Sequence, residues 1–343
     1  MSSAVALATP QTAPGPSTET PARTSARLFM ALITLATVGP WLAIPLLVRW
    51  HAHPDARQLQ TAIVFVGSAM HVAASYYFYL DPAARDTIRA HPRRYLQVPV
   101  ALVVLTAVVF AVSSDRVRFS LLLAYLSWQT YHYMRQNIGV FAFVTKARRT
   151  LAPTTLERYA ITAAGYAGIL GMLVKAAPYE KTPLDGAGGL LRVGSVVAYV
   201  VAGGLLAASL RQSRTAKDPI RLAALVACVG FFLPVLIYHD PVSAVLSYAI
   251  AHGFQYLVFM WFVARRHPAP GAWRLLALAG GLTLGGAFLI DQMSHATFSS
   301  AMSGAIFGAY LGVVMTHFVL DAGVWRLRDP RQRAYMKERF AFL

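Results

Sequence analysis

The sequence predicts an all-α integral membrane protein, a polytopic helix bundle with about ten transmembrane helices and both termini in the cytoplasm. Apolar residues make up 57% of the 343 residues and charged residues only 13%, whereas soluble domains carry about 25% charged residues. The apolar residues gather in blocks of about 20, the length of a helix that spans a bilayer. Short basic clusters separate these blocks, as in proteins that the positive-inside rule orients.

Ten spans are expected, at 27–49, 61–80, 96–112, 118–144, 158–176, 190–210, 220–238, 242–264, 272–290 and 301–325. With the N-terminus inside, 23 of the 31 Lys and Arg residues fall in cytoplasmic segments and seven in external ones, while Arg135 lies within a span. This asymmetry predicts a multi-pass protein of the inner cell membrane. The scatter of Lys and Arg over many short segments also argues against nucleic-acid binding, which needs basic side chains gathered on one face of a folded domain.

The chain divides into three parts. Residues 1–22 are rich in Ala, Pro, Ser and Thr, and are expected to be disordered. Residues 23–325 form the transmembrane bundle. Residues 326–343 are a basic cytoplasmic tail, expected to lie as a surface helix on anionic headgroups or to dock a partner. The single cysteine, Cys228, excludes a disulfide framework, a zinc–cysteine site and an iron–sulfur cluster bound by the chain's own thiolates.

Four of the ten histidines lie within predicted spans: His71, His132, His252 and His317. Each lies within about four residues of the midpoint of its span, which is roughly 6 Å of depth. Ionisable side chains at that depth are costly and usually face the interior of the bundle. We therefore expect the four imidazoles to converge on one metal. The alternative is four separate histidines, each hydrogen-bonded across a helix pair.

Polar side chains accompany these histidines at helical spacing, which places them on the same helix face. The candidates for supporting hydrogen bonds are Gln129, Gln136, Gln255, Tyr248 and Tyr256. Asp321, four residues after His317, is the acid that lies well inside a span, and it is expected to orient a ligating imidazole. Arg135 is expected either to pair with Asp321 or to bind the headgroup or carboxylate of a substrate. We assign catalytic roles to Asp321 and Arg135.

The donor set narrows the choice of metal. Neutral imidazole suits iron, copper, zinc and nickel. The sequence has neither the paired Glu-x-x-His motifs of carboxylate-bridged di-iron proteins nor the H-E-x-x-H motif of zinc peptidases. A mononuclear iron site of histidines with an open position fits this inventory best, and copper is the second choice.

The layout of the four histidines resembles that of the histidine-rich polytopic membrane non-haem iron oxygenases, in the style of the Brp/Blh-type β-carotene dioxygenases. The resemblance implies Fe²⁺, dioxygen and a hydrophobic lipid, isoprenoid or polyene substrate. Two alternatives remain open at this point: a proton-coupled transporter or channel with relay histidines, and a b-type haem redox protein. A second, external site is also open, built from the pairs His239–Asp240 and Asp291–His295.

Overall fold

The computed structural model describes residues 19–50, 53–176, 184, 186–212, 218–266, 272–296 and 299–343. These residues form helices joined by loops, and no strand occurs among them. The all-α prediction is therefore confirmed. Residues 1–18 of the predicted disordered segment lie outside the described residues. The first helix begins at Glu19, so the last four residues of that segment, 19–22, are helical.

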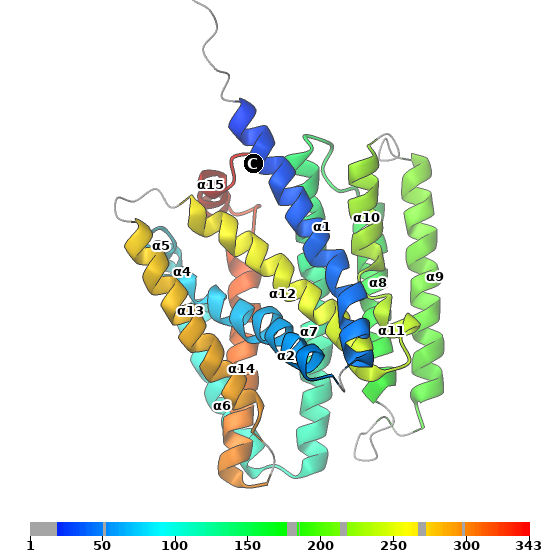
Figure 1. Cartoon of the computed structure of the whole chain (residues 1–343), viewed down its shortest axis with the longest axis vertical. Helices are drawn as coiled ribbons and strands as arrows, with labels where there is room; N and C mark the ends of the chain where they lie inside the picture. The colour runs from blue at the N-terminus through cyan, green and yellow to red at the C-terminus, as the bar shows by residue number, and fades with distance from the viewer. Residues whose placement is uncertain are drawn as a thin grey trace, which may run out of the picture.

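Each of the ten predicted spans contains a helical run (Figure 1). In chain order the elements are α1 (Glu19–Arg49), α2 (Pro54–Phe65), the π-helix η1 (Val66–Met70), α3 (His71–Ser75), α4 (Tyr77–Leu80), α5 (Pro82–Ala90), the π-helix η2 (Arg93–Gln97), α6 (Val98–Val112), α7 (Asp115–Ala147), α8 (Thr155–Ala176), α9 (Gly188–Gln212), α10 (Pro219–Gly230), α11 (Pro234–Ile237), α12 (Pro241–Arg265), α13 (Ala272–Ser294), α14 (Ala301–Val324) and α15 (Pro330–Arg339).

Six helical runs in the described part of the chain are long and apolar enough to cross a membrane: Ala22–Arg49, Pro54–Leu80, Arg93–Val112, Gly188–Gln212, Pro241–Arg265 and Ala301–Val324. The chain is thus an all-helical protein with the apolar helices of a membrane bundle. The start of α1 and the C-terminus lie at the same end of the molecule (Figure 1). That ten helices cross, and that this end faces the cytoplasm, stay predictions.

Asp-Pro pairs begin four of the helices. Asp81, Asp218, Asp240 and Asp329 each precede the first residue of a helix, and each side chain accepts hydrogen bonds from backbone N–H groups of the first turn. Proline suits the next position, because its fixed φ is helical and the first turn needs no N–H donor. These local signals set where α5, α10, α12 and α15 begin.

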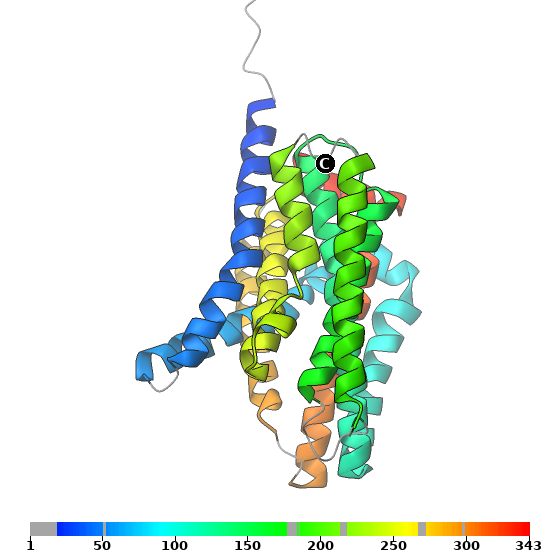
Figure 2. The same ribbon diagram turned by 90° about the vertical axis from the view of Figure 1, so that its right-hand side faces the viewer.

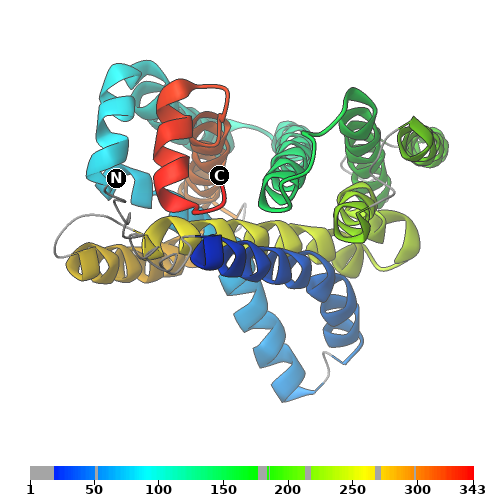
Figure 3. The same cartoon turned by 90° about the horizontal axis from the view of Figure 1, so that it is seen from above.

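Two helix pairs pack closely enough to shape the interior. In α14, Gly304, Gly308 and Gly312 face α6, and a Cβ atom at any of them would overlap the α6 backbone. This stripe of small residues lets the two helices approach as in other membrane bundles. Helices α1 and α12 lie side by side across the middle of the molecule (Figure 3). In contrast, α2 has no buried residue and projects from the bundle (Figure 2).

The C-terminal tail packs one face against the bundle. Its helix α15 buries Gln332, Tyr335, Met336 and Arg339, while Arg331, Arg333 and Lys337 stay exposed. Arg339 is completely buried, and it donates to the Asp81 carboxylate at 3.0 Å. Tyr335 donates to the same oxygen at 2.6 Å. Phe340 is also completely buried and stacks on Phe262, with ring centroids 5.6 Å apart. The tail thus has a buried carboxylate and an aromatic cluster to pack against, and its contact with anionic headgroups stays a prediction.

Candidate metal centre

Four histidines from four helical segments meet inside the bundle. His71 begins α3, directly after the π-helix η1, and His132 lies in the second half of α7. His252 and His317 lie in α12 and α14. No more than 7% of any of them is exposed, and His252 and His317 are completely buried. The structure thus brings together the four residues that span position alone had selected.

A close contact between α12 and η1 places His71 beside His252. A Cβ atom on Gly253 would overlap the carbonyl oxygen of Gly67, so this contact requires glycine. Single π-helical turns occur frequently at functional sites, because the extra residue changes which side chains face inwards. In this chain the π-helical turn ends one residue before His71.

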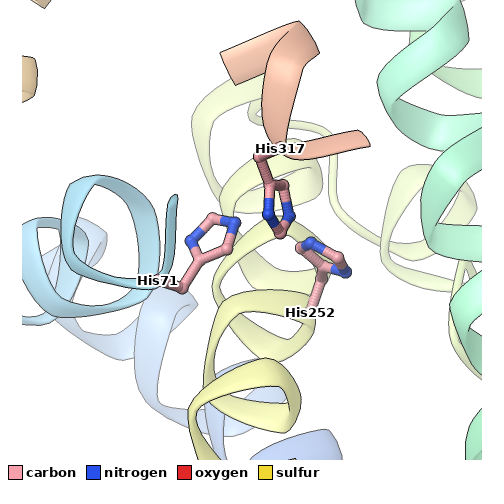
Figure 4. Close-up of side chains that lie close together, drawn as sticks. All are labelled: His71, His252 and His317. Atoms are coloured by element: carbon pink, nitrogen blue, oxygen red, sulfur yellow. The ribbon is translucent and has the colours of Figure 1, made fainter. Parts of the chain in front are cut away.

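The four imidazole rings form a closed cycle. Neighbouring centroids are 5.1 Å apart for His71 and His252, 5.0 Å for His252 and His132, 5.2 Å for His132 and His317, and 5.0 Å for His317 and His71. Across the cycle, the centroids of His252 and His317 are 5.9 Å apart. Figure 4 shows His71, His252 and His317 turned towards a common centre. This is the convergence that a shared ligand would require.

Six of the eight ring nitrogens are buried and lack hydrogen-bond partners. Nδ1 of His71, Nε2 of His132 and both nitrogens of His252 and His317 are buried without a partner. Donor atoms of His71, His252 and His317 lie within 4.8 Å of one another. Buried polar atoms are almost always hydrogen-bonded, because desolvation without a partner is costly. A metal ion would supply the missing partner for several of these nitrogens at once.

Asp321 adds a carboxylate to the cluster. Its Oδ2 atom lies 3.5 Å from Nε2 of His132 and 3.6 Å from Nε2 of His317. Its Oδ1 atom is buried and has no hydrogen-bond partner. Donor atoms of His132, His317 and Asp321 form a second group within 4.8 Å, which shares His317 with the first. Asp321 is therefore placed either to bind a metal directly or to orient the two imidazoles.

Aromatic rings enclose the cluster. Phe318 stacks on His132 with centroids 4.5 Å apart, and Tyr133 stacks on His252 at 4.0 Å. Tyr256 meets His317 edge-on at 4.8 Å. Tyr256 was expected beside the site, but the stacking roles of Tyr133 and Phe318 were not predicted. Their signal in the sequence is simple: each directly follows a histidine that lies within a span.

Two of the predicted glutamines form a bridge between helices. Gln136 Nε2 donates to the backbone oxygen of His252 and to Oε1 of Gln255, both at 3.1 Å. Gln255 in turn donates to Oγ1 of Thr37 at 2.9 Å. The bridge joins α7, α12 and α1 beside the cluster. It holds the backbone of His252 in place and does not contact its ring.

Two other supporting candidates lie further from the histidines. Tyr248 is buried against the rings of Tyr133 and Phe232, at centroid distances of 5.9 and 5.5 Å. It therefore packs behind the ring that stacks on His252. Gln129 is partly buried, and no hydrogen bond joins it to another residue that the structure describes.

Arg135 does not join the site. Its side chain is exposed, whereas His132, three residues earlier, is buried. The side chains that the structure pairs with Asp321 are His132 and His317. The predicted Arg135–Asp321 ion pair is thus absent from the described residues, because the two side chains lie on different sides of the α7 helix. The other reading of Arg135, as a group that binds substrate, stays a prediction.

Asp240 and Asp291, from the two pairs predicted to form an external site, have local contacts. The Asp240 carboxylate caps α12 by accepting from the backbone N–H of Ser243 at 2.6 Å. Burial alone would raise the pKa of Asp240, but the hydrogen bonds from the backbone and side chain of Ser243 lower it below its usual value. Asp291 lies 3.5 Å from His295 on the following turn, and this histidine side chain is 70% exposed.

Comparison with known protein families, curated proteins and solved structures finds no match to this chain.

Proposed function

We propose that the chain is a multi-pass protein of the inner membrane and binds iron through His71, His132, His252 and His317. In this proposal it acts as a non-haem oxygenase or related oxidoreductase on a hydrophobic lipid, isoprenoid or polyene. One observation supports it above the others: four buried imidazoles on separate helical segments face one another, with ring nitrogens that have no hydrogen-bond partner. An intramembrane cluster of ionisable groups is a functional site by default.

The donor set fits a first-row transition metal. The nitrogens on opposite sides of an octahedral ion are about 4.2 Å apart when each bond is about 2.1 Å. Donor atoms lie within 4.8 Å of one another inside each of the two groups, His71–His252–His317 and His132–His317–Asp321, which share His317. Imidazole with one carboxylate suits iron, and the buried Cys228 is not part of either donor group.

The surrounding residues would prepare the site for such chemistry. Phe318, Tyr133 and Tyr256 cover the imidazoles and exclude water, which strengthens every electrostatic interaction inside. With a metal bound, the Asp321 carboxylate would be placed to accept a hydrogen bond from an imidazole N–H, and so to fix the orientation of that ring. When bound, iron would supply the dioxygen chemistry that amino-acid side chains cannot perform.

No observation favours the two alternatives, a b-type haem protein and a transporter with relay histidines. A bis-histidine haem needs its porphyrin ring between two imidazoles. Here all four rings have neighbours at 5.0–5.2 Å, so a porphyrin between any pair would displace the other two. A transporter with relay histidines needs a water path to the cluster, whereas the rings of His252 and His317 are completely buried.

Metal analysis of the purified full chain, with an optical spectrum, tests the proposal. We expect iron at close to one equivalent and no Soret band. His132→Ala and His252→Ala should each lose the iron while the protein still inserts, and His295→Ala, at an exposed histidine, should retain it. A Soret band, or equal metal content in all four proteins, would refute the proposal. Finding stoichiometric copper would support the histidine site but identify its metal as copper instead of iron.

A further inference from the structure

The outward face of α7 carries an arginine among apolar side chains. Exposed residues recur there every three or four positions, so they form one stripe along the helix: Leu121, Ala124, Trp128, Tyr131 and Arg135. We call these five residues the α7 stripe. Trp128 and Tyr131 expose 37% and 40% of their surfaces. The four uncharged residues of this stripe suit contact with lipid, whereas the charged Arg135 does not.

In the predicted ten-span topology α7 crosses the membrane, and Arg135 then lies too deep for its charge to reach water along the helix. It is roughly 18 Å from the inner end of α7 at Ala147 and roughly 30 Å from the outer end at Asp115, at 1.5 Å per residue. The hydrocarbon core is about 30 Å thick, and the basic cluster Lys146, Arg148 and Arg149 marks the inner boundary. Arginines near helix ends reach the headgroups by snorkelling, but one near the middle of the bilayer does not.

No acidic side chain within the described part of the chain pairs with Arg135. The one carboxylate at this depth, Asp321, faces His132 and His317 inside the bundle. An unpaired guanidinium in hydrocarbon is costly, and such residues pair with an anion or mark a substrate path. The position therefore requires an anion that comes from the membrane side.

We propose that Arg135 binds the carboxylate of a long-chain monocarboxylic acid dissolved in the membrane, and that this acid is the substrate class of the histidine site. This inference rests on the proposed function. A carboxylic acid can enter the bilayer in its neutral form and then ionise beside the arginine, because burial of an unpaired charge favours neutralisation. A phospholipid phosphate stays ionised and remains in the headgroup layer. The guanidinium also matches a carboxylate with two parallel hydrogen bonds.

The stripe leads directly to the metal centre. Trp128 packs edge-on against Phe318, with centroids 5.6 Å apart, and Phe318 stacks on His132. One side chain, that of Phe318, therefore lies between Trp128 of the α7 stripe and the imidazole of His132. Trp128 and Tyr131 offer flat, rigid surfaces on which an apolar chain packs at little cost in side-chain entropy. A chain anchored at Arg135 would lie against the wall of the site.

Binding of a fluorescent long-chain polyene fatty acid to the full chain in nanodiscs tests this inference. The uncharged alcohol of the same chain is the comparison ligand. We expect wild type to prefer the acid by about ten- to a hundred-fold, the value of one charge-assisted hydrogen-bonded pair. Arg135→Gln should abolish the preference. Arg135→Lys should keep part of it, since lysine retains the charge but loses the bidentate geometry. Arg116→Gln, also exposed on α7, is the matched control and should behave as wild type.

Several outcomes would overturn the inference. Equal affinity of wild type for acid and alcohol would do so, and so would an undiminished preference in Arg135→Gln. Conversion of an oligomer to a monomer by Arg135→Gln would instead assign the residue to an interface between copies. Metal content is measured on the same samples. Acid preference without metal would keep Arg135 as a carboxylate-binding residue but refute the proposed function, and with it the assignment of the acid as substrate. Metal without acid preference would refute this inference and leave the proposed function standing.

Discussion

The contact between Gly253 and Gly67 offers the most direct test of how the fold builds the metal centre. In Gly253→Ala the added Cβ atom would overlap the carbonyl oxygen of Gly67, and real Cβ atoms essentially never come within 3.0 Å of such an atom. To avoid the overlap, α12 must move away from η1 by about 1 Å. His252 and His71 would separate with these segments. Metal–ligand distances tolerate only about 0.2 Å of error, so we expect the metal to be lost.

The same substitution should cost about 1–3 kcal/mol of stability, the usual price of overpacking a tight core. Two other glycines form a graded series with it. In Gly67→Ala the new Cβ would lie 2.8 Å from Cγ2 of Ile250, a milder overlap than the 1.7 Å of Gly253→Ala, so an intermediate loss is expected. In Gly139→Ala the new Cβ meets nothing within 4 Å. This matched control should gain about 0.5–1 kcal/mol from helix propensity.

Two measurements on detergent-purified protein decide the outcome: the metal-to-protein ratio and the free energy of unfolding from a denaturation series in SDS. The expected order of both quantities is Gly139→Ala, then Gly67→Ala, then Gly253→Ala. If Gly253→Ala keeps both its metal and its stability, the α12–η1 contact does not position the histidines. If Gly139→Ala loses as much as Gly253→Ala, the effect is not local.

Three further predictions follow from other parts of the molecule. Asp321→Asn should weaken metal binding about 10–100-fold if the carboxylate orients imidazoles, and complete loss of metal in a titration would instead make Asp321 a ligand. Arg339→Met should destabilise the protein by about 3–5 kcal/mol, because it removes the cation that neutralises the completely buried Asp81 carboxylate. Adding Asp81→Asn should recover part of this loss, and an unchanged unfolding midpoint in the single variant would show that the tail does not pack as described. Reporter fusions after residues 115 and 185 should score as external and those after 150 and 343 as cytoplasmic, whereas reversal of either pair would refute the ten-span topology.

The fold class, the helical runs and the candidate histidines could be predicted from the sequence because their causes are local. A block of apolar residues forms a helix in a bilayer whatever its neighbours are. An Asp-Pro pair begins a helix with its own side chain and ring, as at Asp240 and Pro241. A histidine in the middle of an apolar block is costly in any arrangement, so His71 and His252 stand out without knowledge of their partners.

Only the tertiary structure decided which side of each helix faces inwards and what lies there. Helical periodicity shows which residues share a face, but not which face meets another helix. Arg135 therefore looked like a partner of Asp321 until α7 was seen to turn it outwards. Similarly, nothing near Arg339 in the chain reveals its acceptor, because Asp81 is 258 residues away. The sequence determined the candidates through local energetics, while packing between distant segments determined which of them meet.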